Sequence, residues 1–325
     1  MFYRTVGSDD YFYYPYETAR EHKRTVVNTI ARRIRDKPEC VEAARIYGGM
    51  IDRHFLGDDP TYFLADVIVR SWAQTSNKGA KATLIQECAR EEFGLPDVNA
   101  PARGDIEQLF WNTVHANGYP ESSEQMWVDM MPGVKTMLRE IYNATQEHLA
   151  DIPDNMPLFR GIGVLNPNPG APNPVTWMLR NMVGGGRGDA AVDLGQGAKA
   201  RGIGSSHAIA TRPLLNPLSS FSTNYNVAAN FATSSWIEKV AESGRNTYDN
   251  ASLLPYIGAP ILIVSLVKKK DILSTPYTGI GCGNESEAVV LGRNSSALAI
   301  VINEHELIAG DITRVVHNAQ VVDVP

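Results

Sequence analysis

Cysteine is scarce in this sequence, with only three such residues among 325, at Cys40, Cys88 and Cys282. Their number is odd, and no two of them stand at a spacing typical of a zinc site or a disulfide framework. The sequence therefore disfavours a disulfide-stapled secreted fold and fits a reducing compartment such as the cytosol.

Long apolar segments are also missing. A membrane-spanning helix needs about 20 consecutive apolar residues, and no segment approaches that length. Residues 1–5 show no basic region followed by an apolar one, as a secretory signal would. We therefore expect no membrane partner. The expected location is the cytoplasm of the producing cell or, if the protein is exported without a signal peptide, the cytoplasm of a target cell.

Several catalytic motifs are absent as well. No Gly-x-Ser-x-Gly occurs, and His305-Glu306 begins like a zinc-protease helix but lacks the second histidine. The glycine-rich region 183–204 has neither the strand nor the Gly-Lys-Ser/Thr ending of a phosphate loop. A serine hydrolase and metal catalysis are disfavoured, and we expect no metal. Basic residues in and after this region are candidates for attracting a polyanion or a cofactor phosphate: Arg187, Lys199, Arg201, His207 and Arg212.

The composition itself is typical of a globular protein. Hydrophobic residues make up 43% of the chain and charged residues 20%, as in ordinary folded domains. A length of 325 residues is enough for two domains. The net charge of -6 disfavours an extended nucleic-acid-binding surface, although local basic patches remain compatible with it.

Residues 1–150 are expected to form a mostly helical domain. In the first helix, apolar residues from Val26 to Ile34 share one face and basic residues crowd the rest. Such a charged face is usually solvated, and the alternative is a surface that docks an acidic partner or a nucleic-acid backbone. Helices are predicted at 18–35, 40–55, 62–74, 81–93, 106–116 and 133–149.

Residues 151–325 are expected to form a second domain of strands with flanking helices, so the fold class is α+β. A helix is predicted after the second strand, because Val227, Ala228 and Phe231 would share a face there. Strands are predicted at 158–162, 218–223, 260–267, 288–291, 297–302 and 313–322.

Two acids, Glu285 and Glu287, stand immediately before the apolar run 288–291. Along a strand, residues i and i+2 point the same way, roughly 6.5–7 Å apart. A pair of carboxylates that overlooks one spot suits glycosidic-bond cleavage, in which one acid stabilises an electron-poor sugar and the other takes a proton.

Two upstream strands carry further candidates. Arg160 interrupts an apolar strand, where a planar guanidinium matches phosphate oxygens in a bidentate manner. The adjacent Gly161 would allow a ligand to approach the backbone. The segment 218–223 is rich in hydroxyl groups that can hold a carboxylate or a ribose by hydrogen bonds.

These three motifs, in this order, resemble the Arg-Ser-Glu class of mono-ADP-ribosyltransferases. The resemblance covers about residues 151–313 and gains its specificity from the combination of the motifs. The family's usual Ser-Thr-Ser reads Ser220-Phe221-Ser222 here. A frame shifted by two residues would spoil the spacing to Ala228. The resemblance implies an ADP-ribosyltransferase-like core of two packed β-sheets, with a cleft for NAD+ between them.

The resemblance also implies a role for each matching residue. Arg160 would bind the phosphates of NAD+, and Ser220 would fix the nicotinamide ribose and the catalytic glutamate. Glu287 would hydrogen-bond the ribose 2'-hydroxyl and stabilise positive charge as nicotinamide leaves. Glu285 would orient and deprotonate the incoming nucleophile. The NAD+ site would further include Gly161, Ser222 and Phe231.

An acid at the position of Glu285 accompanies, in that family, transfer to an arginine guanidinium. The loop 274–284 would meet the acceptor there. Tyr277 is its candidate aromatic contact, although the same residue suits packing the loop down equally well.

The sequence thus predicts a mono-ADP-ribosyltransferase, a bacterial or phage toxin or effector that modifies a macromolecule, with protein arginine favoured. The alternatives are transfer to a base of RNA or DNA, an NAD glycohydrolase in which water is the acceptor, and a non-catalytic binding module. An immunity protein or antitoxin is a further expected partner, because a cell that makes such an enzyme needs protection.

Overall fold

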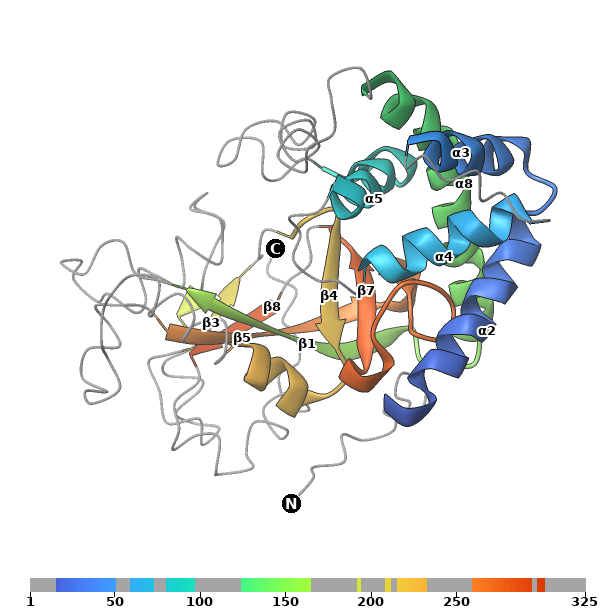
Figure 1. Cartoon of the computed structure of the whole chain (residues 1–325). Coiled ribbons are helices and arrows are strands. Elements are labelled where there is room, and N and C mark those ends of the chain that lie inside the picture. The colour runs from blue at the N-terminus through green and yellow to red at the C-terminus, as the bar shows by residue number, and fades with distance from the viewer. Residues whose placement is uncertain are drawn as a thin grey trace, which may run out of the picture.

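The computed structural model describes residues 16–50, 59–72, 80–96, 124–164, 192–193, 208–211, 215–232, 259–293 and 297–301. Helices dominate the first half of the chain and strands the second (Figure 1). The predicted α+β class is therefore confirmed. The elements predicted at 106–116 and 313–322 lie outside the described residues, and so do the five basic residues of the glycine-rich region.

The helices begin and end close to their predicted bounds, except at the start of the last one and at the end of the second, whose predicted residues 51–55 lie outside the described residues. They are α2 (Tyr16–Ile34), α3 (Pro38–Met50), α4 (Pro60–Trp72), α5 (Ala80–Glu92) and α8 (Glu124–His148). The prediction began the last helix at Gly133, whereas α8 continues through Pro132 from Glu124. Asp59 caps α4, because its carboxylate accepts the backbone N–H groups of Thr61 and Tyr62, each at 3.1 Å.

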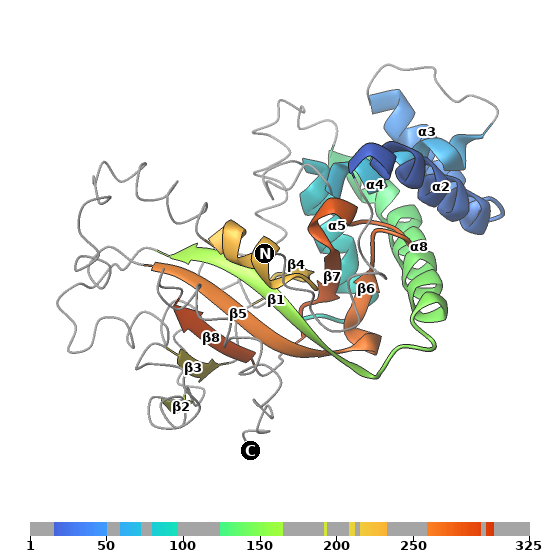
Figure 2. The same ribbon diagram turned by 90° about the horizontal axis from the view of Figure 1, so that it is seen from below.

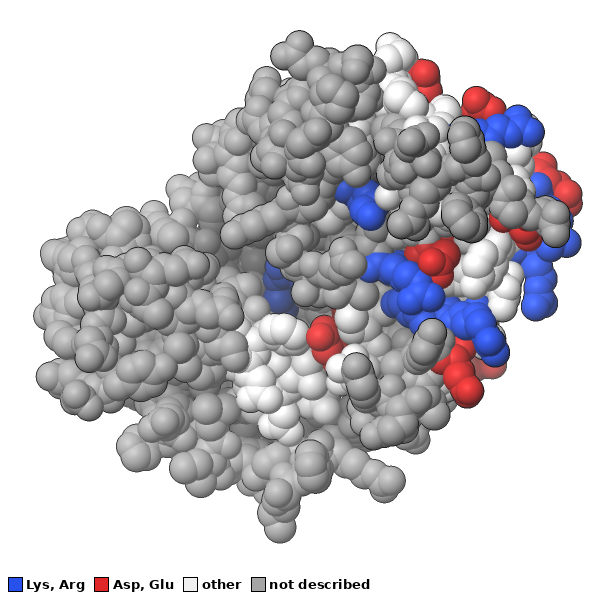
Figure 3. Space-filling model, in the orientation of Figure 1, with Lys and Arg blue, Asp and Glu red and all other residues white. Residues whose placement is uncertain are grey.

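The apolar face of α2 lies in the core. Val27, Ile30 and Ile34 are fully buried, as the helical period predicts. The basic face does not form a uniformly positive surface, because two arginines form ion pairs. Arg33 pairs with Glu147, and Nη2 of Arg35 lies 3.3 Å from Oδ2 of Asp59. On the face shown in Figure 3, the Lys and Arg side chains over the helical region are interspersed with Asp and Glu.

The strands of the second half are joined in one antiparallel sheet in the order β2-β3-β8-β5-β1-β4-β7-β6. Short strands at its ends, β2, β3 and β6, were not predicted from the sequence. The strand bounds are β1 (Asn155–Val164), β2 (Val192–Asp193), β3 (Ala208–Thr211), β4 (Leu218–Ser222), β5 (Ala259–Lys268), β6 (Ile272–Ser274), β7 (Glu287–Leu291) and β8 (Ala297–Val301).

The implied arrangement of two separate packed sheets is corrected by this topology. β1 pairs with β5 over its whole length, yet its other edge pairs with β4 at a single position, Phe159 with Ser222. Hydrogen bonding therefore continues from one group of strands to the other. β4 and β7 run across the direction of β1 and β5 (Figure 1), which is consistent with β1 and β4 pairing at a single position.

The helices pack on the β4-β7-β6 end of the sheet (Figures 1 and 2). Side chains alternate along β7, so that Val289 and Leu291 enter the core cluster of the helices, whereas Val290 belongs to the cluster on the opposite face. Gln86 of α5 binds the backbone of Leu218 twice, through its amide nitrogen at 2.9 Å and its amide oxygen at 2.7 Å. Helices and strands thus share one core across the predicted domain boundary at residue 150.

Among the described residues, no helix is both long and apolar enough to cross a lipid bilayer.

Candidate active site

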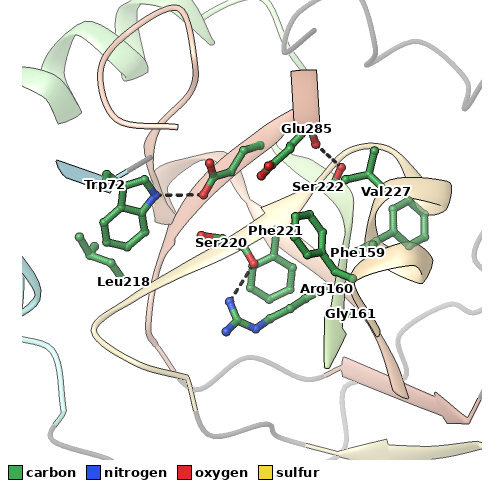
Figure 4. A pocket seen from close by; sticks show the side chains of 13 residues that line it. Trp72, Phe159, Arg160, Gly161, Leu218, Ser220, Phe221, Ser222, Val227 and Glu285 are labelled. Atoms are coloured by element: carbon green, nitrogen blue, oxygen red, sulfur yellow. Dashed lines mark hydrogen bonds between the residues drawn. The ribbon is translucent and has the colours of Figure 1, made fainter. Parts of the chain in front are cut away.

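A cavity of about 190 Å³ lies where β1, β4, β7 and the helix at 225–232 meet (Figure 4). The segments that line it are far apart in the sequence. Every residue assigned above to NAD+ or to catalysis lines this cavity: Arg160, Gly161, Ser220, Ser222, Phe231, Glu285 and Glu287. Further walls come from Phe159, Phe221 and, on the helical side, Trp72.

Arg160 projects from β1 and donates a hydrogen bond from Nη1 to the backbone oxygen of Ser220, at 2.8 Å. Its guanidinium carbon also lies 6.0 Å from the centre of the Phe221 ring, within cation–π range. Burial lowers the pKa of Arg160, and the charge of Glu287 opposes that shift. A guanidinium remains charged under such conditions, so the cavity presents a fixed cation to an anionic ligand.

Gly161 lines the cavity, and protein atoms also occupy the space beside its Cα atom. A Cβ atom at this position would lie 1.8 Å from the backbone oxygen of Ala228 and 2.4 Å from the backbone nitrogen of Ala232. The helix at 225–232 therefore fills the space that a side chain would need. The predicted approach of a ligand to the Gly161 backbone stays a prediction. Glycine is required here so that this helix can pack directly on β1, which fixes one wall of the cavity.

The two serines of β4 differ in their surroundings. Ser220 is half-buried beside Arg160, to which it offers its carbonyl group. The hydroxyl group of Ser222 donates to the backbone oxygen of Glu285 at 2.7 Å and accepts the backbone N–H of Asn224 at 3.0 Å. Ser222 therefore anchors the turn that carries Glu285.

Glu287 is the first residue of β7 and is only 2% exposed. Each of its carboxylate oxygens accepts a hydrogen bond. Trp72 donates its indole N–H to Oε1 at 3.0 Å, and Cys282 donates its backbone N–H to Oε2 at 2.7 Å. The carboxylate is thereby held in one orientation at the cavity wall.

Glu285 does not share the strand with Glu287, so the argument from strand alternation was wrong. Glu285 ends a 3-10 helix, Gly283–Glu285, and the following Ser286 adopts the left-handed conformation with φ 48° and ψ 42°. The turn is closed by a hydrogen bond of 3.2 Å from the backbone N–H of Glu287 to the backbone oxygen of Cys282. Both acids still line the same cavity. One carboxylate oxygen of Glu285, one of Glu287 and the Sγ atom of Cys282 all lie within 4.8 Å of one another.

The environment changes the protonation of this group of side chains. Burial, and next the charge of Glu287, raise the pKa of Glu285 to about 7. Burial and the two carboxylates raise the pKa of the Cys282 thiol to about 12. A metal ion binds cysteine in its thiolate form, whereas Cys282 is a protonated thiol at neutral pH. Glu285 has a pKa close to neutral pH and can therefore exchange a proton there.

Tyr277 lies away from the cavity. Its ring packs 5.8 Å from His22 of α2 and 5.9 Å from His148 of α8, measured between ring centroids. The neighbouring Thr278 hydroxyl bonds the Thr145 hydroxyl at 2.8 Å. The structure thus shows Tyr277 packing against both helices, while its predicted contact with an acceptor stays a prediction. Phe231, which is 45% exposed, is the large apolar side chain at the cavity rim.

Two residues near the acids were missed as site residues by sequence reasoning. Trp72 is 5% exposed and packs in the core of the helices, yet it also binds Glu287. Lys23 was placed on the basic face of the first helix, and its ammonium donates to the backbone oxygen of Gly281 at 2.7 Å. Both contacts join residues more than 200 positions apart, and no local pattern could have indicated them.

Comparison of this chain with family models, curated proteins and solved structures gave no match.

Proposed function

We propose that this protein is a mono-ADP-ribosyltransferase that cleaves NAD+ and transfers ADP-ribose to a macromolecular acceptor, with protein arginine favoured. The observation that carries the proposal is the convergence of Arg160, Ser220, Glu285 and Glu287 on one cavity from three distant segments. They are the residues that the Arg-Ser-Glu pattern selects.

The chemistry of the cavity suits one end of a dinucleotide. A cation at Arg160 complements the phosphates, and the rings of Phe221 and Phe231 offer apolar surface to an aromatic base. The volume of about 190 Å³ is below the roughly 300–1,000 Å³ of pockets that enclose a whole drug-sized ligand. The described cavity therefore accommodates the nicotinamide–ribose end.

In the proposed reaction, the bond between the ribose C1' and the nicotinamide nitrogen breaks, and its electron pair leaves with neutral nicotinamide. The positive charge that develops on the ribose is stabilised by the oriented carboxylate of Glu287. A guanidinium nitrogen of the acceptor then bonds C1' and releases a proton to Glu285. With a pKa of about 7, Glu285 is suited to accept that proton near neutral pH.

The acceptor preference rests on Glu285 being beside Glu287 in the cavity. A nucleic-acid acceptor was supported by the basic first helix and the basic loop. At the basic helix, Arg33 and the adjoining Arg35 form ion pairs with acidic residues. The family pattern at Glu285 therefore keeps protein arginine as the first choice.

The test is incubation of the purified protein with labelled NAD+ and whole-cell lysate, followed by separate protease and nuclease treatment. The proposal predicts that the label is attached to protein, so that protease releases it and nuclease does not. Neutral hydroxylamine should remove the label at the rate typical of an arginine linkage. Label released by nuclease would instead make a nucleic acid the acceptor. Nicotinamide release at full rate without any macromolecule would indicate an NAD glycohydrolase, and no turnover of NAD+ would contradict the proposal.

A further inference from the structure

We infer that Trp72, from the helical half of the chain, is a positioning residue for Glu287, and that the transferase site is therefore completed by α4. This inference rests on the proposed function for its catalytic meaning. Its structural basis is the hydrogen bond of 3.0 Å from the indole N–H to Glu287 Oε1 (Figure 4).

The direction of the Glu287 side chain explains why a helix can reach it. Glu287, Val289 and Leu291 occupy alternate positions of β7, and the latter two lie in the core cluster of the helices. The period of two places Glu287 on the same face. The catalytic carboxylate thus points toward the helices, where Trp72 ends α4.

The pair of hydrogen bonds leaves the carboxylate able to act. An ionised carboxylate has about four acceptor positions on its two oxygens. Trp72 and the backbone of Cys282 use one position on each oxygen, and the Cys282 thiol is hydrogen-bonded to the same carboxylate. An acceptor position therefore remains for a ribose hydroxyl. The indole therefore orients Glu287 rather than blocking it.

A second contact from the helical half supports the same arrangement. Lys23 of α2 donates to the backbone oxygen of Gly281, the residue before Cys282. This contact holds the loop whose backbone N–H binds Glu287 Oε2. Two helices of the first half therefore fix Glu287 from both sides, directly through Trp72 and indirectly through Lys23.

The test compares Trp72→Phe with Trp127→Phe in the full chain. Trp127 is also fully buried in the helical core but does not line the cavity, so its variant controls for the loss of indole packing. For NAD+ cleavage by Trp72→Phe, we expect kcat to fall about 10- to 100-fold, the effect of losing one hydrogen bond to a charged group. KM for NAD+ should change by less than about threefold, because an oriented carboxylate acts mainly in the transition state.

Four outcomes of the kinetic test are decisive. A low kcat with unchanged KM for Trp72→Phe, beside normal kinetics for Trp127→Phe, supports the inference. Equal kcat in Trp72→Phe and wild type overturns it, and so does a higher kcat, which would make the contact inhibitory. If the wild type itself fails to cleave NAD+, the proposed function is wrong, and the contact between Trp72 and Glu287 then has no catalytic role.

The hydrogen bond has its own readout, which does not depend on activity. The chain contains five tryptophans, so the nitrogen-15 indole signals can be assigned by their loss in single variants. The Trp72 signal should exchange slowly with solvent and should shift in Glu287→Gln, where a neutral amide replaces the carboxylate. A fast-exchanging signal that is insensitive to this substitution would overturn the structural part of the inference.

Discussion

At the scale of single residues, the two carboxylates of the site lie in different environments. Glu287 is buried and held by two N–H donors, whereas Glu285 lies in a turn and has a pKa raised to about 7 by burial and by its neighbour. Two acids in one cavity can divide the work in this way, since one is held in a fixed orientation while the other moves a proton.

Replacing Glu285 by Gln should reduce transfer to arginine far more than NAD+ hydrolysis, because water needs less help from a base in this reaction than a guanidinium does. We expect at least about a 100-fold loss of transfer, within the range of general-base contributions. Parallel assays of nicotinamide release and of labelled arginine product measure the two rates. Equal losses in both assays would remove the proton-accepting role.

The same carboxyl group also makes stability depend on pH with a defined sign. Its pKa is raised from 4.5 to about 7 in the folded protein, so the folded state binds the proton more tightly. Its contribution to stability is present below pH 4.5 and is lost as pH rises to about 7. The advantage in Tm of Glu285→Gln over wild type should therefore grow across this interval, and a constant difference would contradict the raised pKa.

At the scale of elements, the cavity depends on close packing of the helix at 225–232 on β1. Gly161 permits that contact, because any Cβ atom would collide with the backbone of Ala228. Backbone atoms cannot rotate away as a side chain can, so the elements themselves would have to separate.

Gly161→Ala should therefore destabilise the protein by about 1–3 kcal/mol, as overpacking does, and should also lower the affinity for NAD+. Gly49→Ala is the matched control, because the nearest atom to a Cβ atom there is 3.9 Å away. Gly49 is the last but one residue of α3 (Pro38–Met50), so alanine there should leave stability unchanged or raise it by less than about 1 kcal/mol. Urea unfolding measures both variants, and a Gly161→Ala variant as stable as wild type would disprove the packing argument.

Much of this arrangement is predictable from the sequence. The helical and alternating periods predicted the helices, the long strands and the buried face of α2, and the ordered motifs predicted the residues of the cavity. Local patterns do not predict three features of the site: the left-handed turn at Ser286, the packing of a helix on Gly161, and the hydrogen bond from Trp72 to Glu287. The last two depend on contacts between segments that only the folded chain brings together.

At the scale of the whole molecule, the helical half and the sheet form one unit. Leu218, Val289 and Leu291 of the sheet lie in the same core cluster as α2, α4, α5 and α8. Apolar side chains at such positions contribute to stability in proportion to the area that they bury. Removal of the helices would expose one face of β4-β7-β6 and release Glu287 from Trp72.

A fragment of residues 151–325 is therefore expected to lose cooperative unfolding and NAD+ cleavage, although it contains every residue of the Arg-Ser-Glu pattern. Thermal unfolding followed by circular dichroism, with the full chain measured beside it, tests this expectation. A fragment that melts cooperatively and cleaves NAD+ at the rate of the full chain would show that the helices are dispensable.

The most direct measurement of the central claim is nicotinamide release from NAD+ by the purified full chain and by Glu287→Gln. The account predicts release by the wild type and a loss of at least about 100-fold in the variant, the order of effect seen when one electrostatic stabiliser is removed, while both proteins keep the same Tm within a few degrees. Equal release by the two proteins, or none by a folded wild type, would contradict the assignment of this cavity as an ADP-ribosyltransferase active site.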